Sequence, residues 1–268
     1  MEKQIKLQIK DIVHYYESKD GKIVHALNNI NLCVKDGEFL AIVGSSGCGK
    51  STLLNIMSGM IKPTKGQVLI DGEELNFNKH NIGYISQSDT LLPWRKMIDN
   101  VAIGLEIKGV PKKERHEVAR SLMETSGLSG FENKYPYELS GGMRKRGIII
   151  RALATNPDII FMDEPFGPLD VFTKEILQDE ILNIWEHRKN TIIYITHDIA
   201  ESIALADRII LMSYRPSSIK AEYNVNLPRP RNIKKDKYNR QFMELEECIW
   251  EDIKNEVLKA RKEEMMNI

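Results

Sequence analysis

Two kinds of hydrophobic pattern alternate along this 268-residue chain. Residues 7–12 and 30–34 alternate apolar with polar side chains, which is the pattern of strands with one buried face. A turn-rich stretch, residues 15–21, lies between them and ends in Asp-Gly, a pair that suits a hairpin turn. The sequence therefore predicts antiparallel β structure near the start of the chain.

Four other segments are continuous apolar runs of strand length, at residues 39–43, 159–162, 191–195 and 209–212. Such runs are typical of strands that are covered on both faces, as in a parallel sheet. Helical patterns at residues 173–187 and 198–206 separate the last three runs, and Asp198 and Glu201 have the spacing of a capping box. The alternation predicts an α/β fold with a mainly parallel sheet and helices on both faces.

The middle of the chain has a different character, because residues 88–155 carry helical patterns and no clear strand. Residues 111–126 form a charged amphipathic pattern that ends at Gly127, a residue favoured after helix C-termini. Ser140 stands where a helix N-cap belongs, and Asn156-Pro157 should stop the helix that follows it. These signals predict a helical lobe inserted into the α/β core.

The last part of the chain is predicted to be a linker followed by a helix. Residues 227–231, Leu-Pro-Arg-Pro-Arg, indicate a turn or an extended linker. Residues 242–257 have apolar side chains at helical spacing, which predicts an amphipathic helix within a C-terminal segment at 233–268. This helix either packs on its own domain or makes a regulatory or dimer contact, and the sequence leaves both open.

The composition is that of an ordinary globular protein, with 42% hydrophobic and 28% charged residues. Because 38 basic residues balance 38 acidic ones, we expect no nucleic-acid partner bound through bulk charge. No apolar run is long enough to predict a membrane span, and the N-terminus lacks the apolar core of a signal peptide. Cys33, Cys48 and Cys248 are far apart, which favours neither a disulfide framework nor a zinc site.

The stretch after the first apolar run has the form G-x-x-x-x-G-K-[ST] of a phosphate-binding P-loop, or Walker A motif. It consists of Gly44, Ser45, Ser46, Gly47, Cys48, Gly49, Lys50, Ser51 and Thr52. Glycines permit the tight curl that points several backbone N–H groups at one phosphate, and the next helix adds the partial positive charge of its start. Lys50 should pair with the β- and γ-phosphates, and the Ser51 hydroxyl should reach Mg²⁺.

A pair of carboxylates, Asp163 and Glu164, follows the apolar run at 159–162. Residues at the carboxyl ends of parallel strands line the crevice where such sheets bind ligands. Asp163 is therefore predicted to hold Mg²⁺, directly or through water. Glu164 is predicted to be the general base that polarises the attacking water.

Leu139-Ser140-Gly141-Gly142-Met143 resembles the signature motif of ATP-binding cassette (ABC) transporter ATPases. That family also has a P-loop, an apolar strand that ends in Asp-Glu, a downstream Asp and a later His, and all stand here in the family order. The resemblance covers residues 5–232. It implies a RecA-like P-loop NTPase core with an N-terminal antiparallel β-subdomain (5–87 and 156–232) and an inserted helical subdomain (88–155).

The same resemblance assigns further roles around bound ATP. Tyr16 matches the aromatic residue that stacks on adenine, with Tyr15 as a competitor. Gln87 matches the residue that contacts Mg²⁺ and water and links the site to the membrane partner. His197 matches the histidine that contacts the γ-phosphate and orders Glu164, and Lys50 adds electrostatic stabilisation.

The resemblance also implies that one chain holds only half of each site. Ser140, Gly141 and Gly142 would bind the γ-phosphate of ATP held by a second copy, in a head-to-tail dimer with two sandwiched nucleotides. Asp170 would lie in the loop that crosses this interface. Hydrolysis is therefore expected to depend on dimer closure.

Further segments resemble one branch of the family, the ATPases of nitrate, sulfonate and taurine uptake systems. They include residues 91–94, 143–146, 164–170 and 227–231. The branch implies the ATP-hydrolysing subunit of a bacterial importer at the cytoplasmic face of the cell membrane, with a separate permease and, indirectly, an extracytoplasmic solute-binding protein. Another transporter branch is an alternative. So is a non-transport ABC ATPase of DNA repair or ribosomes, although that class favours a coiled-coil insertion or two cassettes.

Several residues depart from the branch. Lys145 stands where Gln is usual, Gly147 where Val is usual, Pro168 replaces Ala, and Ser45 replaces a common Pro. Gly147 should soften its helix by about 1 kcal/mol relative to Ala, and Pro168 should stiffen the interface loop.

Two side chains have alternative roles that the sequence does not separate. Cys48 is either a thiol activated by Lys50 and the loop amides or a small group that fills the loop. Trp94 either docks a cytoplasmic helix of the permease or packs inside the helical lobe, together with Leu91 and Leu92.

Overall fold

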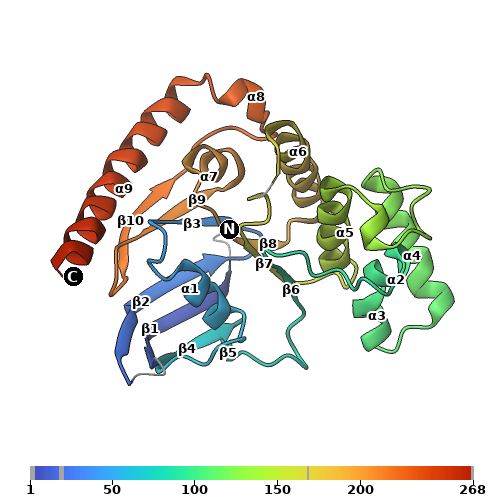
Figure 1. Cartoon of the computed structure of the whole chain (residues 1–268), viewed down its shortest axis with the longest axis horizontal. Coiled ribbons are helices and arrows are strands. Elements are labelled where there is room, and N and C mark those ends of the chain that lie inside the picture. The colour runs from blue at the N-terminus through green and yellow to red at the C-terminus, as the bar shows by residue number, and fades with distance from the viewer. Residues whose placement is uncertain (1–3, 18–20, 168, 267–268) are drawn as a thin grey trace. The chain divides into compact units, whose positions relative to one another are not determined.

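The computed structural model describes residues 4–17, 21–167 and 169–266, so Pro168 and its predicted effect lie outside the described residues. The chain forms two compact units (Figure 1). The first joins Met1–His80 to Arg188–Ile268, and the second is Asn81–His187. The second unit includes all of the predicted helical subdomain, residues 88–155.

The first unit contains an antiparallel sheet with the strand order β2-β1-β4-β5. Its strands are β1 (Ile5–Glu17), β2 (Ile23–Lys35), β4 (Lys65–Ile70) and β5 (Glu73–Glu74). Leu7, Ile9 and Ile12 are buried while the residues between them are more exposed, as the alternating pattern predicts. The strand β1 runs on to Glu17, so Tyr15 and Tyr16 lie in a strand and not in the turn.

The same unit holds the parallel strands that carry the P-loop. The strand β3 (Phe39–Val43) lies between β8 (Thr191–Ile195) and β9 (Arg208–Met212) and is parallel to both. Every residue of β3 and β8 is buried, which fits continuous apolar runs covered on both faces. The edge strand β10 (Ile219–Asn224) pairs antiparallel with β9 and was not predicted.

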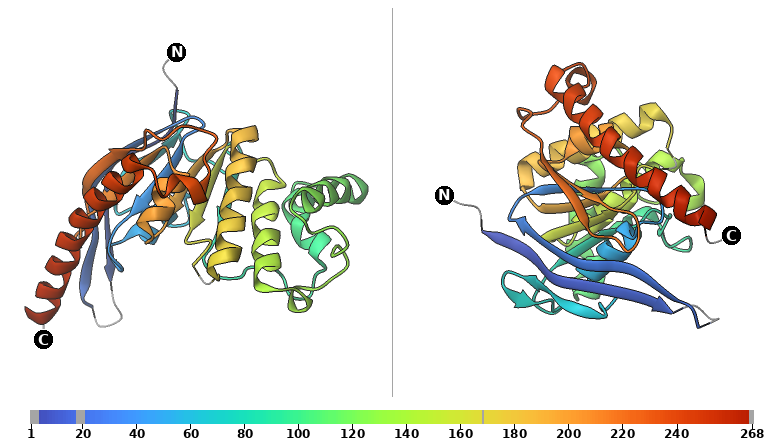
Figure 2. Two further views of the ribbon diagram at one scale, coloured as in Figure 1. Left: turned by 90° about the horizontal axis from the view of Figure 1, so that it is seen from above. Right: turned by 90° about the vertical axis from the view of Figure 1, so that its left-hand side faces the viewer.

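The described part of this unit also contains the helices α1 (Lys50–Met57), α7 (Ile199–Leu205), α8 (Ile233–Asp236) and α9 (Arg240–Met266). The C-terminal helix α9 lies along β10 (Figure 2), where Tyr223 donates a hydrogen bond to Asp252. Phe242 and Ile249 are buried on one side of α9. Burial of each such side chain stabilises the folded state by about 1.5–3 kcal/mol relative to leaving it in water. The predicted amphipathic helix therefore packs on its own unit.

The second unit combines a parallel strand pair with helices. The strands β6 (Ile82–Ile85) and β7 (Ile159–Asp163) pair in register from Ile82 with Ile159 to Ile85 with Met162. The helical elements are α2 (Met97–Val101), α3 (Ile103–Ile107), α4 (Lys112–Thr125), η1 (Pro136–Glu138), α5 (Gly141–Leu153) and α6 (Val171–Arg188). Figure 2 shows α5 and α6 side by side, and Arg146 forms an ion pair with Glu180 between them.

Gly147 has a packing role in α5. A Cβ atom at this position would lie 2.7 Å from Sδ of Met97, which is closer than real contacts allow. The glycine therefore lets the buried side chain of Met97 approach the backbone of α5.

None of the helices within the described ranges is long and apolar enough to cross a membrane. The α/β class with a P-loop, a mainly parallel core and an antiparallel N-terminal sheet is confirmed. The division of the chain into subdomains at residues 88 and 155 stays a prediction.

Candidate functional site

The P-loop curls between β3 and α1 as its glycines predict. Gly47 has φ +72° and Gly49 has φ +109°, both in the region that L side chains rarely adopt. A Cβ on Gly49 would also lie 3.0 Å from Cδ2 of Leu27. Gly49 is the residue before α1, so the loop ends at a helix start, where unpaired N–H groups favour an anion.

The ammonium of Lys50 is folded back onto this loop. Its Nζ donates to the carbonyl oxygens of Gly44 at 3.0 Å and Ser45 at 2.9 Å, and the side chain is largely buried. These carbonyls fix the cation beside the loop amides. A phosphate on those amides would therefore lie near a positive charge.

The Cys48 side chain lies inside the loop. It is fully buried, and Sγ occupies space that a Cβ on Gly44 would enter at 2.9 Å. Burial raises the pKa of the Cys48 thiol and outweighs the opposing charge of Lys50. Of the two roles that the sequence leaves open, the structure favours the one in which Cys48 fills the loop.

Tyr16 and Tyr15 have separate surroundings because neighbouring residues on a strand point to opposite faces. The Tyr16 hydroxyl lies 3.2 Å from Oγ1 of Thr52, the last residue of the P-loop motif. Tyr15 instead stacks on the His25 ring, with centroids 4.3 Å apart. Tyr16 is therefore the aromatic side chain that touches the nucleotide motif.

His197 follows β8 at the same edge of the sheet as the P-loop, since Ile42 pairs with Ile195 in parallel register. The turn around it is braced by Thr196, whose hydroxyl donates to Glu201 at 2.8 Å and accepts from the Asp198 N–H at 3.0 Å. Asp198 caps α7 by accepting from the Glu201 N–H, as predicted. The His197 side chain is exposed at this edge.

In the second unit, β7 delivers the two predicted carboxylates. Asp163 is the last residue of the strand, and burial together with the Asp163 charge raises the pKa of Tyr84 on β6 to about 12. Glu164 has φ +42°, an uncommon value for a residue with a side chain, which costs about 1–3 kcal/mol. Such strain is typical of functional sites, where the surrounding structure holds it.

Gln87 lies beside Glu164. Its side-chain Nε2 donates to Oε2 of Glu164 at 3.2 Å, which joins the residue after β7 to the segment after β6. A carboxylate fixed in this way can accept a proton from water with its remaining lone pairs.

The predicted signature segment begins α5. The Ser140 hydroxyl accepts from the Met143 N–H at 3.3 Å and caps the helix. Ser140 and Gly141 are exposed, and no acidic residue occupies the first turn, so the helix start can receive an anion. Asp170 caps α6 by accepting from the Thr173 N–H at 3.0 Å, and hydrogen bonds from Thr173 lower the pKa of this carboxyl.

The predicted site residues therefore fall into two groups. The P-loop from Gly44 to Thr52, Tyr16 and His197 belong to the first unit. Gln87, the carboxylates at 163–164, the signature at 140–142 and Asp170 belong to the second. The predicted Mg²⁺ donors are the hydroxyl of Ser51, the carboxylate of Asp163 and the amide of Gln87, oxygen groups that suit this ion.

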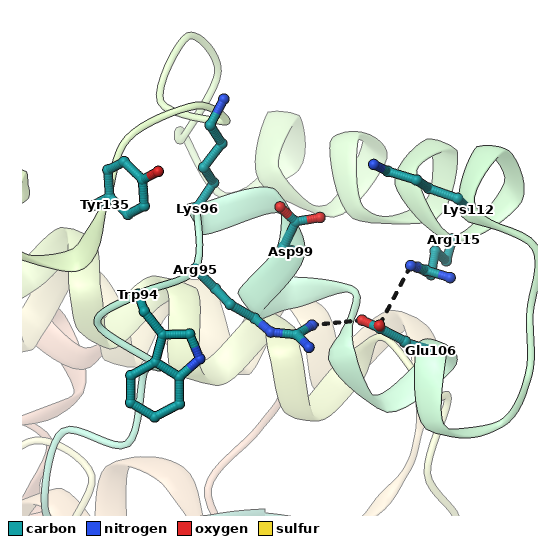
Figure 3. Close-up of a pocket in the computed structure, with 8 residues that line it drawn as sticks. All are labelled: Trp94, Arg95, Lys96, Asp99, Glu106, Lys112, Arg115 and Tyr135. Carbon is teal, nitrogen blue, oxygen red and sulfur yellow. Dashed lines mark hydrogen bonds and ion pairs between the residues drawn. The ribbon is translucent and has the colours of Figure 1, made fainter.

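The second unit also contains a hollow of about 330 Å³ (Figure 3). Its lining residues are Trp94, Arg95, Lys96, Asp99, Glu106, Lys112, Arg115 and Tyr135. Arg95 and Arg115 both point at the Glu106 carboxylate, at 2.6 and 3.6 Å. Leu91 is buried and Leu92 is partly buried, which fits the packing alternative, whereas Trp94 is 71% exposed and does not fit it.

Sequence reasoning missed three contacts that join α5 to the Gln87 segment. Lys145 donates to the Gln87 carbonyl, Arg144 to Asp89 and Arg151 to Thr90. Lys145 stood out only as a departure from the branch pattern, because its partner is 58 residues away in the sequence.

Known proteins are similar to this chain over most of its length. Residues 27–167 match the family model for the ABC transporter domain. An uncharacterized ABC transporter ATP-binding protein of Methanocaldococcus jannaschii is 44% identical over 97% of this chain and 95% of its own. A taurine import ATP-binding protein of Rhizobium johnstonii is 40% identical over 88% and 91%, and a nitrate import ATP-binding protein of Synechocystis is 38% identical over 96% and 97%.

Among solved structures, a dimeric ATP-binding cassette bound to ADP and Pi is 33% identical. The match covers 83% of this chain and all of that one, with a TM-score of 0.73. The sequence, the P-loop fold and these relatives agree on one conclusion. The chain belongs to the ABC transporter family.

Proposed function

We propose that this protein is the ATP-hydrolysing subunit of an ABC importer that takes up a small oxyanion. Taurine and nitrate, the solutes in the names of two relatives, both carry a compact oxyanion group. The observation that supports hydrolysis most strongly is the hydrogen bond from Gln87 to Glu164, because it joins a water-orienting amide after β6 to a carboxylate after β7.

The chain's own residues divide the chemistry between binding and proton transfer. The P-loop amides and Lys50 would bind the phosphates, and Tyr16 would stack on adenine. Ser51, Asp163 and Gln87 would hold Mg²⁺, which supplies charge neutralisation of the phosphates when bound. Glu164 would accept the proton of the attacking water, and His197 would contact the γ-phosphate.

A second copy of the chain would complete each site. The exposed start of α5, with Ser140, Gly141 and Gly142, would bind the γ-phosphate of ATP on the partner's P-loop, and Asp170 would lie at the interface. The dimeric cassette among the similar structures supports this arrangement. ATP binding would then close the dimer, and hydrolysis would reopen it.

A separate permease would be the membrane partner. The chain would bind the permease at the cytoplasmic face of the membrane, and a solute-binding protein would deliver the solute on the opposite side. The hollow in Figure 3 is a candidate docking surface, because it combines an exposed indole with four cations and two carboxylates. An amphipathic segment of a permease that carries an apolar and an acidic residue would fit this lining.

The test is uptake of labelled nitrate, taurine and an alkyl sulfonate by vesicles that contain the chain and the membrane permease that copurifies with it. We expect ATP-dependent uptake of at least one anion, abolished by Glu164→Gln. Copurification with ribosomes or DNA, together with no uptake of any of the three anions, would contradict the proposal.

A further inference from the structure

Helix α5 presents three cations to one short segment, residues 87–90. Nζ of Lys145 donates to the Gln87 carbonyl at 2.7 Å. Nε of Arg144 donates to the Asp89 carboxylate at 2.7 Å, and Arg151, two turns further along the helix, donates to the Thr90 carbonyl at 2.6 Å. The segment is thus bound to the helix that begins with the signature residues.

Lys145 is the unusual member of this group, because its side chain is only 5% exposed. A buried ammonium is costly in free energy unless it is paired with an opposite charge, and Lys145 donates to a neutral carbonyl. Burial lowers the pKa of Lys145 although the Asp89 charge opposes this effect. An apolar side chain of similar length would fill the same volume without that cost, so packing alone does not explain a lysine here.

The partner of Lys145 is the residue that contacts the predicted base. The backbone carbonyl of Gln87 is held by Lys145, and its side-chain amide donates to Glu164 at 3.2 Å. One residue is therefore fixed at both ends, by the signature helix on one side and by the catalytic carboxylate on the other.

We propose that Lys145 is a positioning residue for ATP hydrolysis, which holds the Gln87 backbone against the signature helix so that the Gln87 amide stays on Glu164. The proposal rests on the ATPase function proposed above. A change at Lys145 should therefore slow the catalytic step. It should leave ATP binding intact, because Lys145 is not part of the P-loop that is proposed to bind the phosphates.

The first test compares three variants at steady state. Lys145→Met keeps the length and removes the donor, and we expect kcat to fall about 10-fold with the KM for ATP within twofold of wild type. Lys145→Gln keeps a donor and should retain more activity. Lys113→Met, the same change on the exposed surface of α4, should leave both constants unchanged. A raised KM with normal kcat in Lys145→Met would contradict the proposal.

The second test separates positioning from a general structural role. In a Gln87→Ala background there is no side-chain amide to position, so Lys145→Met should have little further effect on kcat. An equal fold-loss in the Gln87→Ala and wild-type backgrounds would overturn the proposal.

The third test needs no ATPase activity. Hydrogen exchange of the nucleotide-free protein should be faster over residues 86–92 in Lys145→Met and near wild type in Lys145→Gln, with α4 unchanged in both. Unchanged exchange over 86–92 in Lys145→Met would contradict the positioning role even in an active enzyme. If Lys145→Met exchanges faster over residues 86–92 but the wild-type protein shows no ATPase activity, the result contradicts the proposed function and not the positioning role.

Discussion

The side-chain amide of Gln87 and the carboxylate of Glu164 are joined by a hydrogen bond of 3.2 Å. The two residues follow β6 and β7, which are neighbouring parallel strands, so their carboxyl ends meet at one edge. Glu164 also has the strained φ of +42°. A base that is held by a neighbour and by its own backbone needs little rearrangement before it acts, which is the physical basis of the mechanism proposed here.

Tyr16 and Tyr15 form a matched pair for testing adenine recognition. Tyr16→Ala should raise the Kd for ATP about 2- to 10-fold, because an aromatic stack contributes about 0.5–1.5 kcal/mol. Tyr15→Ala should change it less than twofold, since Tyr15 stacks on His25. Titration with a fluorescent ATP analogue measures both, and a larger effect for Tyr15→Ala would reverse the assignment.

Trp94→Ala tests the docking surface. An exposed indole at the centre of an interface typically contributes about 2 kcal/mol or more, so permease binding should weaken roughly 30-fold and uptake should fall. The ATPase activity of the isolated protein should be unchanged. The control is Trp250→Ala, which removes an exposed indole on α9 instead, and it should leave uptake intact. Normal uptake by the Trp94→Ala complex would remove Trp94 from the interface.

The carboxylate of Glu256 should stabilise the packing of α9 in a pH-dependent way. Its carboxylate is 2% exposed, accepts from the Tyr214 N–H at 2.8 Å and lies within 3.3 Å of Lys220 and 2.9 Å of Lys259. Burial would raise the pKa of Glu256, but the Tyr214 N–H and the two lysines outweigh it, and the pKa is lowered.

A lowered carboxyl pKa stabilises the fold above the unfolded-state value of about 4.5, and this stabilisation is lost as the pH falls through the native pKa. Glu256→Gln should therefore reduce the free energy of unfolding at pH 7 by about 1–3 kcal/mol, with a smaller loss below about pH 4. Urea unfolding at both pH values measures this. Glu251→Gln, on the exposed side of α9, should change little, and a pH-independent loss in Glu256→Gln would contradict the assignment.

The fold was largely predictable because its main signals are local. The buried strands β3, β7 and β8 are continuous apolar runs, and the Ser140 and Asp198 caps stand at the predicted helix starts. The strand β10 was missed because it is a partly exposed edge strand without a clear apolar pattern. The helices α2 and α3 have five residues each, which is too short to show helical periodicity.

The site residues could be predicted where a local sequence motif contains them. They could not be predicted where their role depends on contacts with residues far away in the sequence. The P-loop curl follows from its glycines. The burial of Cys48 depends on other elements, and the proposed role of Lys145 depends on a carbonyl 58 residues away. The resemblance already favoured Tyr16 over Tyr15, and the contact of Tyr16 with Thr52 supports that assignment.

We propose that Glu164 is the general base for ATP hydrolysis, in a dimer closed by two nucleotides. The most direct measurement is ATP turnover and molecular mass of Glu164→Gln with Mg²⁺ and ATP, with Glu117→Gln on the exposed face of α4 as the control. We predict turnover reduced by about 10²-fold or more, together with a stable ATP-dependent dimer. Near-normal turnover in Glu164→Gln, or a monomer at saturating ATP, would contradict the account.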